Sequence, residues 1–397
     1  MTVGKERLLF LSAHLPSPQA REAGQKTAFR NLECLARRYA ITLVAFSNER
    51  EGRLSQQAVR ELCKEVVVVP VGRMTRLRGV LARPDVPLAV AARWSARAMR
   101  VLQRLLRTES YQRVHCEWGQ MAAYASSFNS VRLRTLNLHD VLYQWCERRA
   151  ELGRGLWGCF WKAESVRARR WERRSYEYFS CIYAPTEKDR RLVAELSDRL
   201  ARRTWVLGHH VGRFGVGGTA DARAEPRILF WGALGREENA AAVQWLTREV
   251  FPLVKSRVAE AELLVVGSDP PAWLRNLTAD GVRVTGYVED PGPYFRSARV
   301  AALPLFAGAG VKIKVLECLA AGIPVVTTAV GAEGIAAGPD EGLVVSEGTP
   351  EAFASRLVRL LEDPEYAARL GAAAAWWSER NLKDDFELLV NPPIEEA

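Results

Sequence analysis

The chain has 397 residues, of which 48% are hydrophobic and 26% charged, with 56 Lys and Arg against 46 Asp and Glu. This composition excludes a disordered or low-complexity protein, and no apolar run approaches the roughly 20 residues that cross a bilayer. The formal net charge of +10 divides unevenly: residues 1–205 hold 38 basic and 20 acidic residues, and the remainder hold 18 and 26. This asymmetry and the length, at roughly 100–200 residues per domain, predict two domains with different partners.

The first half of the sequence alternates short apolar runs with helical patterns. Its predicted strands are residues 7–12, 41–46, 65–71, 114–116, 134–138 and 181–184, and a helix is predicted over 27–39. Strands separated by helices predict a doubly wound parallel α/β sheet. The first apolar core, Leu8–Leu11, is too short for a signal peptide. Seven scattered cysteines without a C-x-x-C pair fit a reducing cytoplasm better than a disulfide framework or a zinc site.

Residues 208–226 contain five glycines and little apolar content, and we interpret them as a linker. After the linker the alternation restarts. The predicted strands are 227–231, 262–266, 282–285, 300–304 and 324–328, and the predicted helices are 240–254, 314–321, 350–361 and 364–377. We therefore expect a basic N-terminal domain over 1–207, a C-terminal domain over 227–375, and a tail over 376–397 that can cross back to the first domain.

The segment 304–334, PLFAGAGVKIKVLECLAAGIPVVTTAVGAEG, is the most informative about function. A loop of small residues, 307–310, follows a predicted strand and opens a helix, and backbone N–H groups in such a place bind anions. Lys312 and Lys314 add positive charge, but at this spacing they cannot both face one ligand. Glu317, one turn into the helix, can accept hydrogen bonds from ribose hydroxyls, so the segment describes a site for a nucleotide diphosphate. The alternative is an ordinary turn with a solvated Glu317, and neither G-x-G-x-x-G nor a Walker loop is present.

A family resemblance begins in the same segment. GAGVKIKVLECLAAGIPVVTTAVGAEGI, together with the preceding RILFWGALGREENAAAVQWLTREVFPLVKSRVAEAELLVVGSDPP and VRVTGYVEDPGPYFRSARVAALPL, resembles the C-terminal signature of group 1 (family 4) glycosyltransferases of the GT-B fold. LLFLSAHLPSPQAREAGQKTAFRNLECLARRYAITLVAF and, more weakly, VHCEWGQMAAYA resemble sugar transferases linked to bacterial exopolysaccharide operons. The resemblance implies two Rossmann-like domains facing across a cleft, the first for the acceptor and the second for a nucleotide sugar. The implied reaction moves a sugar from a nucleotide-diphosphate sugar to an acceptor hydroxyl in bacterial polysaccharide or glycoconjugate synthesis.

The resemblance also implies roles for single residues. Glu317 matches the Glu that binds the donor ribose, and His139 matches a His that contacts the donor sugar near the reacting carbon. The implied donor-binding residues are Gly24, Gly232, Asn239, Tyr287, Gly308, Gly310, Val311, Lys312 and Glu317. Of these, Gly308, Gly310 and Val311 match the loop that meets the diphosphate, Tyr287 the position beside the nucleobase, and Gly24 and Gly232 the glycine loops that open the two domains.

Two stretches depart from the family's pattern. Ala309 stands where the family carries a first Glu that touches the donor sugar, which leaves the sugar open. Many members also carry an Arg and a Lys after the first strand of the second domain, where this chain reads GALGREEN. Lys312 or Arg236 is the candidate for the missing charge.

The resemblance and the absence of an Asp-x-Asp motif together indicate how the reaction proceeds. No metal and no permanently bound cofactor are expected, because loop amides, a helix N-terminus and Lys312 would stabilise the leaving diphosphate of a UDP- or GDP-sugar. The family retains the configuration of the transferred sugar. We therefore expect the leaving phosphate to help deprotonate the acceptor and His139 to orient the sugar.

The basic first domain offers a second candidate surface. Over 93–107 the arginines recur at helical spacing, which predicts one face formed by Arg93, Arg97, Arg100, Arg104 and Arg107. Residues 148–174 are also basic and carry four interleaved aromatic side chains. These surfaces are expected either to dock on an anionic membrane that holds a glycan or lipid-linked acceptor or to be the solvated faces of packed helices. Nucleic-acid binding fits the charge alone, and no recognition motif supports it.

Several alternatives remain open at this point. His209 and His210 resemble a metal pair but lack further ligands at suitable spacing, so a loop role is the simpler interpretation. Glu117 and Asp140 are either structural or bases toward an acceptor. The chain as a whole is either a glycosyltransferase, a GT-B-fold epimerase or hydrolase, or a catalytically weak binding protein. We expect it in the cytoplasm, free or at the inner face of the cell membrane.

Overall fold

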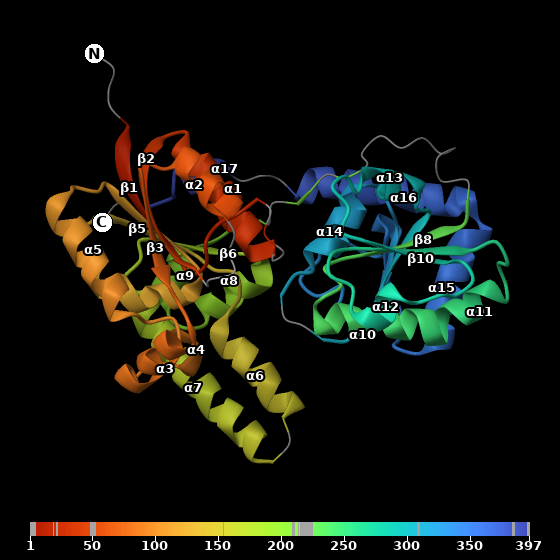
Figure 1. Ribbon diagram of the computed structural model, residues 1–397, viewed down its shortest axis with the longest axis horizontal. Helices are drawn as coiled ribbons and strands as arrows, with labels where there is room; N and C mark the ends of the chain where they lie inside the picture. The colour runs from red at the N-terminus through yellow and green to blue at the C-terminus, as the bar shows by residue number, and fades with distance from the viewer. Residues whose placement is uncertain are drawn as a thin grey trace. The chain divides into compact units, whose positions relative to one another are not determined.

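The computed structural model describes residues 5–18, 20, 23–47, 53–153, 155–208, 211–212, 214, 225–307, 310–382 and 386–394. The chain divides into two compact units: unit 1, Met1–Gly208 with Asp384–Ala397, and unit 2, His209–Lys383 (Figure 1). Each unit is built on one parallel sheet, which confirms the predicted fold class of two doubly wound parallel-sheet domains.

Unit 1 contains seven parallel strands in the order β3-β2-β1-β4-β5-β6-β7. The strands are β1 (Glu6–Ser12), β2 (Tyr39–Ser47), β3 (Glu65–Pro70), β4 (Arg113–Glu117), β5 (Leu133–Asn137), β6 (Cys181–Ala184) and β7 (Thr204–Val206). The helices are α1 (Ala23–Ala36), α2 (Arg53–Leu62), α3 (Arg73–Ala82), α4 (Leu88–Ala91), α5 (Ala96–Thr108), the 3-10 helix η1 (Gly119–Phe128), α6 (Leu142–Leu152), α7 (Leu156–Tyr176), α8 (Glu187–Ala194), α9 (Asp198–Arg203) and α17 (Phe386–Val390).

The central strand β1 shows why its sequence is apolar without interruption. Successive side chains of a strand point to opposite faces, and both faces of this sheet are covered. Leu8 and Phe10 belong to one hydrophobic cluster, which also holds side chains of α1, and Leu9 and Leu11 belong to the other, which holds side chains of α5. Continuous burial of this kind is typical of parallel sheets.

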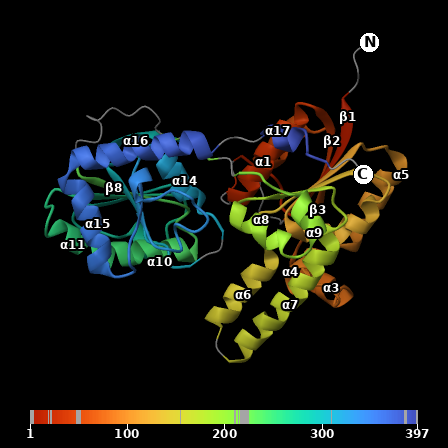
Figure 2. The same cartoon turned by 180° about the vertical axis from the view of Figure 1, so that it is seen from behind.

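The C-terminal helix α17 packs on unit 1 beside α1 (Figure 2). Its carbonyl groups meet Arg113, a fully buried arginine of β4, whose Nη1 donates to the carbonyl of Leu389 at 2.8 Å. Tyr183 of β6 donates its hydroxyl to the carbonyl of Leu388 at 2.9 Å. Since a buried charge is costly without hydrogen-bond partners, the carbonyls of α17 stabilise Arg113, and Arg113 in turn helps hold α17 on the sheet.

Helices α6 and α7 form an antiparallel hairpin that projects from the body of unit 1 (Figure 1). Glu172 of α7 is fully buried at the base of this hairpin and accepts hydrogen bonds from the backbone N–H groups of Leu142 and Tyr143, at 2.9 and 3.0 Å, where α6 begins. A carboxylate is favourable at a helix N-terminus, but burial raises the pKa of Glu172 to about 7.

Unit 2 contains six parallel strands in the order β10-β9-β8-β11-β12-β13. The strands are β8 (Arg227–Trp231), β9 (Glu262–Val266), β10 (Val282–Gly286), β11 (Val300–Leu303), β12 (Val325–Thr327) and β13 (Leu343–Val345). The helices are α10 (Glu237–Trp245), a π-helical turn (Leu246–Val250), α11 (Phe251–Lys255), α12 (Ala272–Arg275), α13 (Gly292–Ser297), α14 (Ile313–Ala320), the 3-10 turn η4 (Pro339–Glu341), α15 (Pro350–Glu362) and α16 (Pro364–Asn381). Helices cover both faces of the sheet, with α13, α14 and α16 on one face and α10 and α11 on the other (Figure 1).

The predicted strands all occur, with ends that differ by up to two residues, while the strands β7 and β13 and many of the helices, α17 among them, were not predicted. The helix predicted over 240–254 is interrupted by the π-helical turn, and Pro252, which lacks an N–H group, lies in the first turn of α11. Within the described part of the chain, no helix is both long and apolar enough to cross a membrane.

Candidate active site

The first six strands of unit 1 have the same order as the six strands of unit 2, and in both sheets the direction of winding reverses between two central strands. These switch points lie between β1 and β4 in unit 1 and between β8 and β11 in unit 2. Ligands of open α/β sheets bind at the carboxyl ends of the strands at such points. The predicted site residues can therefore be compared with two defined places in the fold.

At the switch point of unit 1, Gly24 and His139 lie in contact. Gly24 is in the first turn of α1, and His139 follows β5. A Cβ atom on Gly24 would lie 3.1 Å from Cζ2 of Trp118 and 3.3 Å from Nδ1 of His139, so a larger residue would press on both rings. Trp118 stacks on His139 with ring centroids 4.1 Å apart, and its φ of 73° is rare for a bulky side chain. Backbone strain of this kind concentrates at functional sites.

Glu117, at the end of β4, fixes the orientation of His139. Its fully buried carboxylate accepts hydrogen bonds from Nε2 of His139 at 2.7 Å and from Nε2 of His115 at 3.0 Å. The side-chain amides of Asn31 and Asn137 also donate to it, at 2.7 and 3.0 Å. Burial alone would raise the pKa of Glu117, but hydrogen bonds and charge interactions with the two histidines outweigh burial and lower it. The ionised carboxylate directs Nε2–H of His139 inward and leaves Nδ1 on the side of Gly24.

Behind Glu117, a second set of buried polar groups continues the network to the C-terminal helix. Burial lowers the pKa of His115, so the ring is neutral, and with Nε2 donating to Glu117 its Nδ1 accepts from the Thr135 hydroxyl at 2.8 Å. Thr135 accepts in turn from Nε and Nη2 of Arg113, each at 3.1 Å. The orientation of His139 is therefore connected through hydrogen bonds to Arg113 and α17.

Arg93 differs from the prediction that it belongs to an exposed arginine face. Helix α5 begins only at Ala96, with Ser95 as its N-cap, so helical spacing does not apply to Arg93. Its guanidinium donates to the carbonyl of Ala13 and to Nε2 of His14, each at 3.0 Å, just beyond β1. Burial and the charge of Arg93 lower the pKa of His14 to about 3. The neutral His14 ring packs at 4.9 Å against Trp118, so Arg93 supports the unit 1 site.

The other arginines of the predicted face, Arg97, Arg100, Arg104 and Arg107, are exposed along α5, and its buried side is formed by Ala98, Leu102 and Leu105. The structure thus shows an amphipathic helix packed on the sheet with a solvated basic face.

Asp140, next to His139 in the sequence, has a pKa raised by burial.

In unit 2, a glycine turn follows β8. Gly232 has a φ of 156°, and its carbonyl lies against Gly267, where a Cβ atom would be only 1.6 Å from that oxygen. Asn239, buried in α10, donates from Nδ2 to the carbonyl of Ala233 at 2.7 Å and so holds the turn. Both Gly232 and Asn239 were predicted as donor-binding residues, and the structure brings them together at this switch point.

Lys314 of α14 reaches the same turn. Its Nζ donates to Oδ1 of Asn239, would lie 3.1 Å from a Cβ atom on Gly232, and is 5.8 Å from the ring centroid of Phe230. Burial and the neighbouring charge of Arg236 lower the pKa of Lys314 to about 8. In the described part of the chain, no carboxylate forms an ion pair with this ammonium group. A desolvated cation held by a neutral amide favours a bound anion.

The residues preceding α14 were predicted to form the diphosphate loop. Gly308 and Ala309 lie outside the described residues. Gly310 has a φ of 73°, and open space surrounds the position of its missing Cβ atom, while Val311 is half-buried. Lys312 is the N-cap of α14, and its ammonium donates to the carbonyl of Gly310 at 2.6 Å. Lys314, rather than Lys312, reaches the glycine turn.

Glu317 lies on α14 and is half-buried beside the last residue of β8. Trp231 donates its indole N–H to Oε2 of Glu317 at 2.7 Å. The ring of Phe214 packs against Trp231 with centroids 5.7 Å apart, and a Cβ atom on Gly212 would lie 3.2 Å from Oε1 of Glu317. These residues of the predicted linker therefore belong to the surroundings of Glu317, while His209 and His210 lie outside the described residues.

The last predicted donor residue, Tyr287, is exposed and follows β10, two strands from the switch point.

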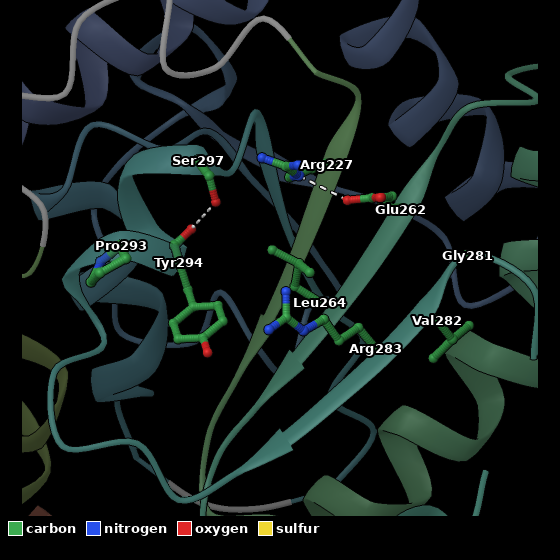
Figure 3. Close-up of a pocket in the computed structure, with 9 residues that line it drawn as sticks. All are labelled: Arg227, Glu262, Leu264, Gly281, Val282, Arg283, Pro293, Tyr294 and Ser297. Carbon is green, nitrogen blue, oxygen red and sulfur yellow. Dashed lines mark hydrogen bonds and ion pairs between the residues drawn. The ribbon is translucent and has the colours of Figure 1, made fainter. Parts of the chain in front are cut away.

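A pocket of about 610 Å³ lies elsewhere in unit 2, at the amino ends of the strands, around Arg227, Glu262 and Arg283 (Figure 3). Arg227 pairs with Glu262 there at 2.8 Å, and Figure 3 marks this pair with a dashed line. Because the pocket lies at the opposite edge of the sheet from the glycine turn, it is distinct from the candidate site.

Sequence reasoning missed Trp118, His14 and Trp231, which contact predicted residues, and chose Lys312 over Lys314 as the donor-binding lysine. The two-residue spacing of the lysines showed only that they face different directions. Trp231 ends a predicted strand and Trp118 lies two residues beyond one. This position at the carboxyl end of a strand is the one sequence signal that could have identified them.

Two doubly wound parallel-sheet units in one chain are the two domains of the GT-B fold. The family model described as "Glycosyl transferases group 1" matches residues 225–363, which cover most of unit 2. This match spans about a third of the chain, so residues 225–363 are similar to the group 1 glycosyltransferases. No curated protein sequence matches the chain significantly.

Solved structures with the same fold extend over both units. The chain is similar to sucrose-phosphate synthase from Thermosynechococcus elongatus, with a TM-score of 0.66, 17% identity, and coverage of 97% of this chain and 96% of that one. It is similar to HepE of Anabaena in complex with UDP-glucose, with a TM-score of 0.61, 14% identity and coverage of 97% of both chains. It is also similar to WaaG, a glycosyltransferase involved in lipopolysaccharide biosynthesis, with a TM-score of 0.64, 17% identity, and coverage of 97% and 100%.

Proposed function

We propose that the protein is a glycosyltransferase that takes its sugar from a nucleotide-diphosphate sugar bound at the switch point of unit 2. The observation that carries the proposal is Lys314, a desolvated cation at the glycine turn whose partner in the described chain is the neutral side chain of Asn239. A diphosphate placed there would gain a charge-assisted hydrogen bond from Lys314 and backbone N–H groups from Gly310 and Val311 at the start of α14.

The direction of α14 indicates where the ribose of the donor would lie. Glu317 lies three residues beyond Lys314, almost one helical turn, and its carboxylate can accept hydrogen bonds from the ribose hydroxyls. Tyr287 is the proposed neighbour of the base. UDP is the first nucleotide to test, because HepE, which shares the fold, was solved with UDP-glucose.

For the chemical step, we propose transfer with retention of configuration. The bond between the anomeric carbon and the diphosphate oxygen breaks, and the acceptor oxygen forms the new bond. The leaving phosphate takes the acceptor proton. Lys314 and the loop amides stabilise the charge that develops on the leaving group, and no metal is required. His139, held by Glu117, is proposed to orient the donor sugar.

The acceptor is proposed to be a glycan or a lipid-linked glycan in bacterial polysaccharide or glycoconjugate synthesis, including exopolysaccharide. The basic surplus of unit 1 supports an anionic acceptor or an anionic membrane surface. On α5, the exposed Arg97, Arg100 and Arg104 would add long-range attraction to such a surface. We propose that the enzyme works in the cytoplasm at the inner face of the membrane.

The test is turnover by the purified full-length protein with a panel of UDP- and GDP-sugars, with and without bacterial lipid and glycan extracts as acceptors, in EDTA. Acceptor-dependent release of UDP supports the proposal. Conversion of a nucleotide sugar without an acceptor identifies an epimerase or hydrolase instead, and loss of all turnover in EDTA, restored by a divalent metal, contradicts the metal-independent mechanism.

A further inference from the structure

Helix α3 of unit 1 turns its apolar side chains outward. Met74, Leu77 and Leu81 lie on one stripe of the helix and are 61%, 52% and 72% exposed. The buried side of α3 is formed by Gly79, where a Cβ atom would lie 2.2 Å from the carbonyl of Ala91, so the helix packs through its backbone on α4. An amphipathic helix of a globular protein normally buries its apolar stripe, and this helix leaves it uncovered.

The tip of the α6–α7 hairpin, residues 142–176, exposes a second apolar group. Leu156 and Trp157 begin α7 at the far end of the hairpin and are 89% and 69% exposed, and Phe160 follows one turn later (Figure 1). The ends of the two helices approach closely, since a Cβ atom on Gly158 would lie 2.7 Å from the carbonyl of Gly153. Gly153 and Gly158 therefore allow the two helix ends to lie close together beside the exposed aromatic side chains.

Exposed basic residues lie on the same helices as both apolar groups. The segment 71–83, which contains α3, has four arginines and no acidic residue. Both acidic residues of α7 are turned inward: Glu172 caps α6, and Glu164 accepts the backbone N–H of Leu88 at 2.8 Å. The exposed basic residues of α7 are Lys162, Arg167, Arg169, Arg170, Arg173 and Arg174.

Hydrogen bonds connect the two helices. The side chain of Arg167, in the middle of α7, donates from Nη2 to the carbonyls of Pro84 and Val86, each at 2.7 Å, in the segment that follows α3. Arg149 of α6 stacks over the rings of Trp145 and Trp161, at 4.5 and 5.0 Å, and stiffens the hairpin. We call the exposed side chains of Met74, Leu77, Leu81, Leu156, Trp157 and Phe160 the α3/α7 surface.

We propose that the α3/α7 surface inserts into the headgroup region of an anionic phospholipid bilayer. Aromatic and aliphatic side chains supported by Lys and Arg are the composition of helices that lie in a membrane interface. A second copy of this chain would bring the same cations against each other, whereas anionic headgroups complement them. The inference rests on the proposed membrane location of the enzyme. Its test contains no donor, so it and the proposed reaction can fail separately.

The experiment measures binding of the full-length protein to vesicles of phosphatidylglycerol with phosphatidylcholine, and to phosphatidylcholine alone. We expect binding to the anionic vesicles that persists in part at high salt, because burial of apolar surface is not screened. Two variants, Trp157→Ser with Phe160→Ser, and Met74→Ser with Leu77→Ser and Leu81→Ser, should each lose roughly tenfold or more in affinity. Bromine-labelled lipids should quench the fluorescence of the parent protein more than that of Trp157→Phe.

A matched control is Trp376→Ser, which removes another exposed tryptophan (56%, against 69% for Trp157) from α16 of unit 2 and should bind as the parent does. Since all these side chains are exposed, circular dichroism should show every variant folded. A parent protein that does not bind anionic vesicles overturns the inference. So does binding abolished by Arg97→Glu with Arg100→Glu and Arg104→Glu but unaffected by both serine variants. A dimer in solution that the serine variants dissociate would assign the surface to self-association and also overturn it.

Discussion

Replacing Lys314 with Met separates a ligand-binding role of this lysine from a structural one, because the two roles predict opposite effects. A pKa lowered from 10.5 to about 8 means that the fold disfavours the charged form, by about 3 kcal/mol at roughly 1.4 kcal/mol per pH unit. This cost is fully present below pH 8 and vanishes above the unfolded pKa of 10.5. Loss of the hydrogen bond to Asn239 costs about 1 kcal/mol. The free protein should therefore gain about 2 kcal/mol in free energy of unfolding at pH 7.

Donor binding should change in the other direction. A charge-assisted hydrogen bond to the diphosphate contributes about 1.5–3 kcal/mol, so Lys314→Met should weaken UDP binding by roughly 10- to 150-fold. In the wild type, affinity for UDP should fall above pH 8 as the free ammonium loses its proton. Titration calorimetry with UDP and urea denaturation measure the two effects, and Lys312→Met, which removes the neighbouring charge, is the control and should weaken UDP binding less. Unchanged UDP affinity in Lys314→Met together with a destabilised free protein would show that Lys314 is a structural residue and does not bind the donor.

Three further predictions concern single residues. Glu317→Ala should weaken UDP binding by about 1.5–3 kcal/mol if its carboxylate holds the ribose, and calorimetry that shows unchanged affinity removes it from the site. Glu117→Gln places an amide N–H against four donors, so it should lower the free energy of unfolding by about 1–3 kcal/mol. It should also lower kcat more than it weakens UDP binding. A fully active variant would show that the orientation of His139 does not matter for turnover. Because its pKa is raised in the folded protein, Glu172 makes the wild type lose free energy of unfolding as pH rises from 4.5 to 7. Glu172→Gln should therefore become more stable relative to the wild type over that range, by up to about 3 kcal/mol. A constant difference between the two denaturation curves contradicts this.

The sequence predicted the sheets well because both faces of every central strand are buried, as in β1, where Leu8 to Leu11 enter two cores. Short strands such as β13 carry too few residues for a periodic signal, and α17 is stabilised by contacts with α1 and Arg113 that only the fold brings together. Helical spacing placed Arg93 in the wrong environment, since the N-cap at Ser95 excludes it from α5.

The candidate sites were predictable in part. Gly24 and His139 are 115 positions apart in the sequence and were assigned separately through the resemblance, and the structure shows that they touch. Glu117 was a candidate base, and its four hydrogen-bond donors instead define a carboxylate that orients His139. Which of Lys312 and Lys314 reaches the glycine turn depends on the rotation of α14 about its axis, which the sequence alone does not determine.

A crystal structure of the protein with UDP would show whether the donor site is built on Lys314 at the switch point of unit 2. We expect the diphosphate to lie against Nζ of Lys314 and the backbone N–H groups of Gly310 and Val311, with the ribose hydroxyls on Glu317. UDP bound elsewhere, such as in the pocket around Arg227 and Glu262, or bound at the switch point without contact to Lys314, would contradict this expectation.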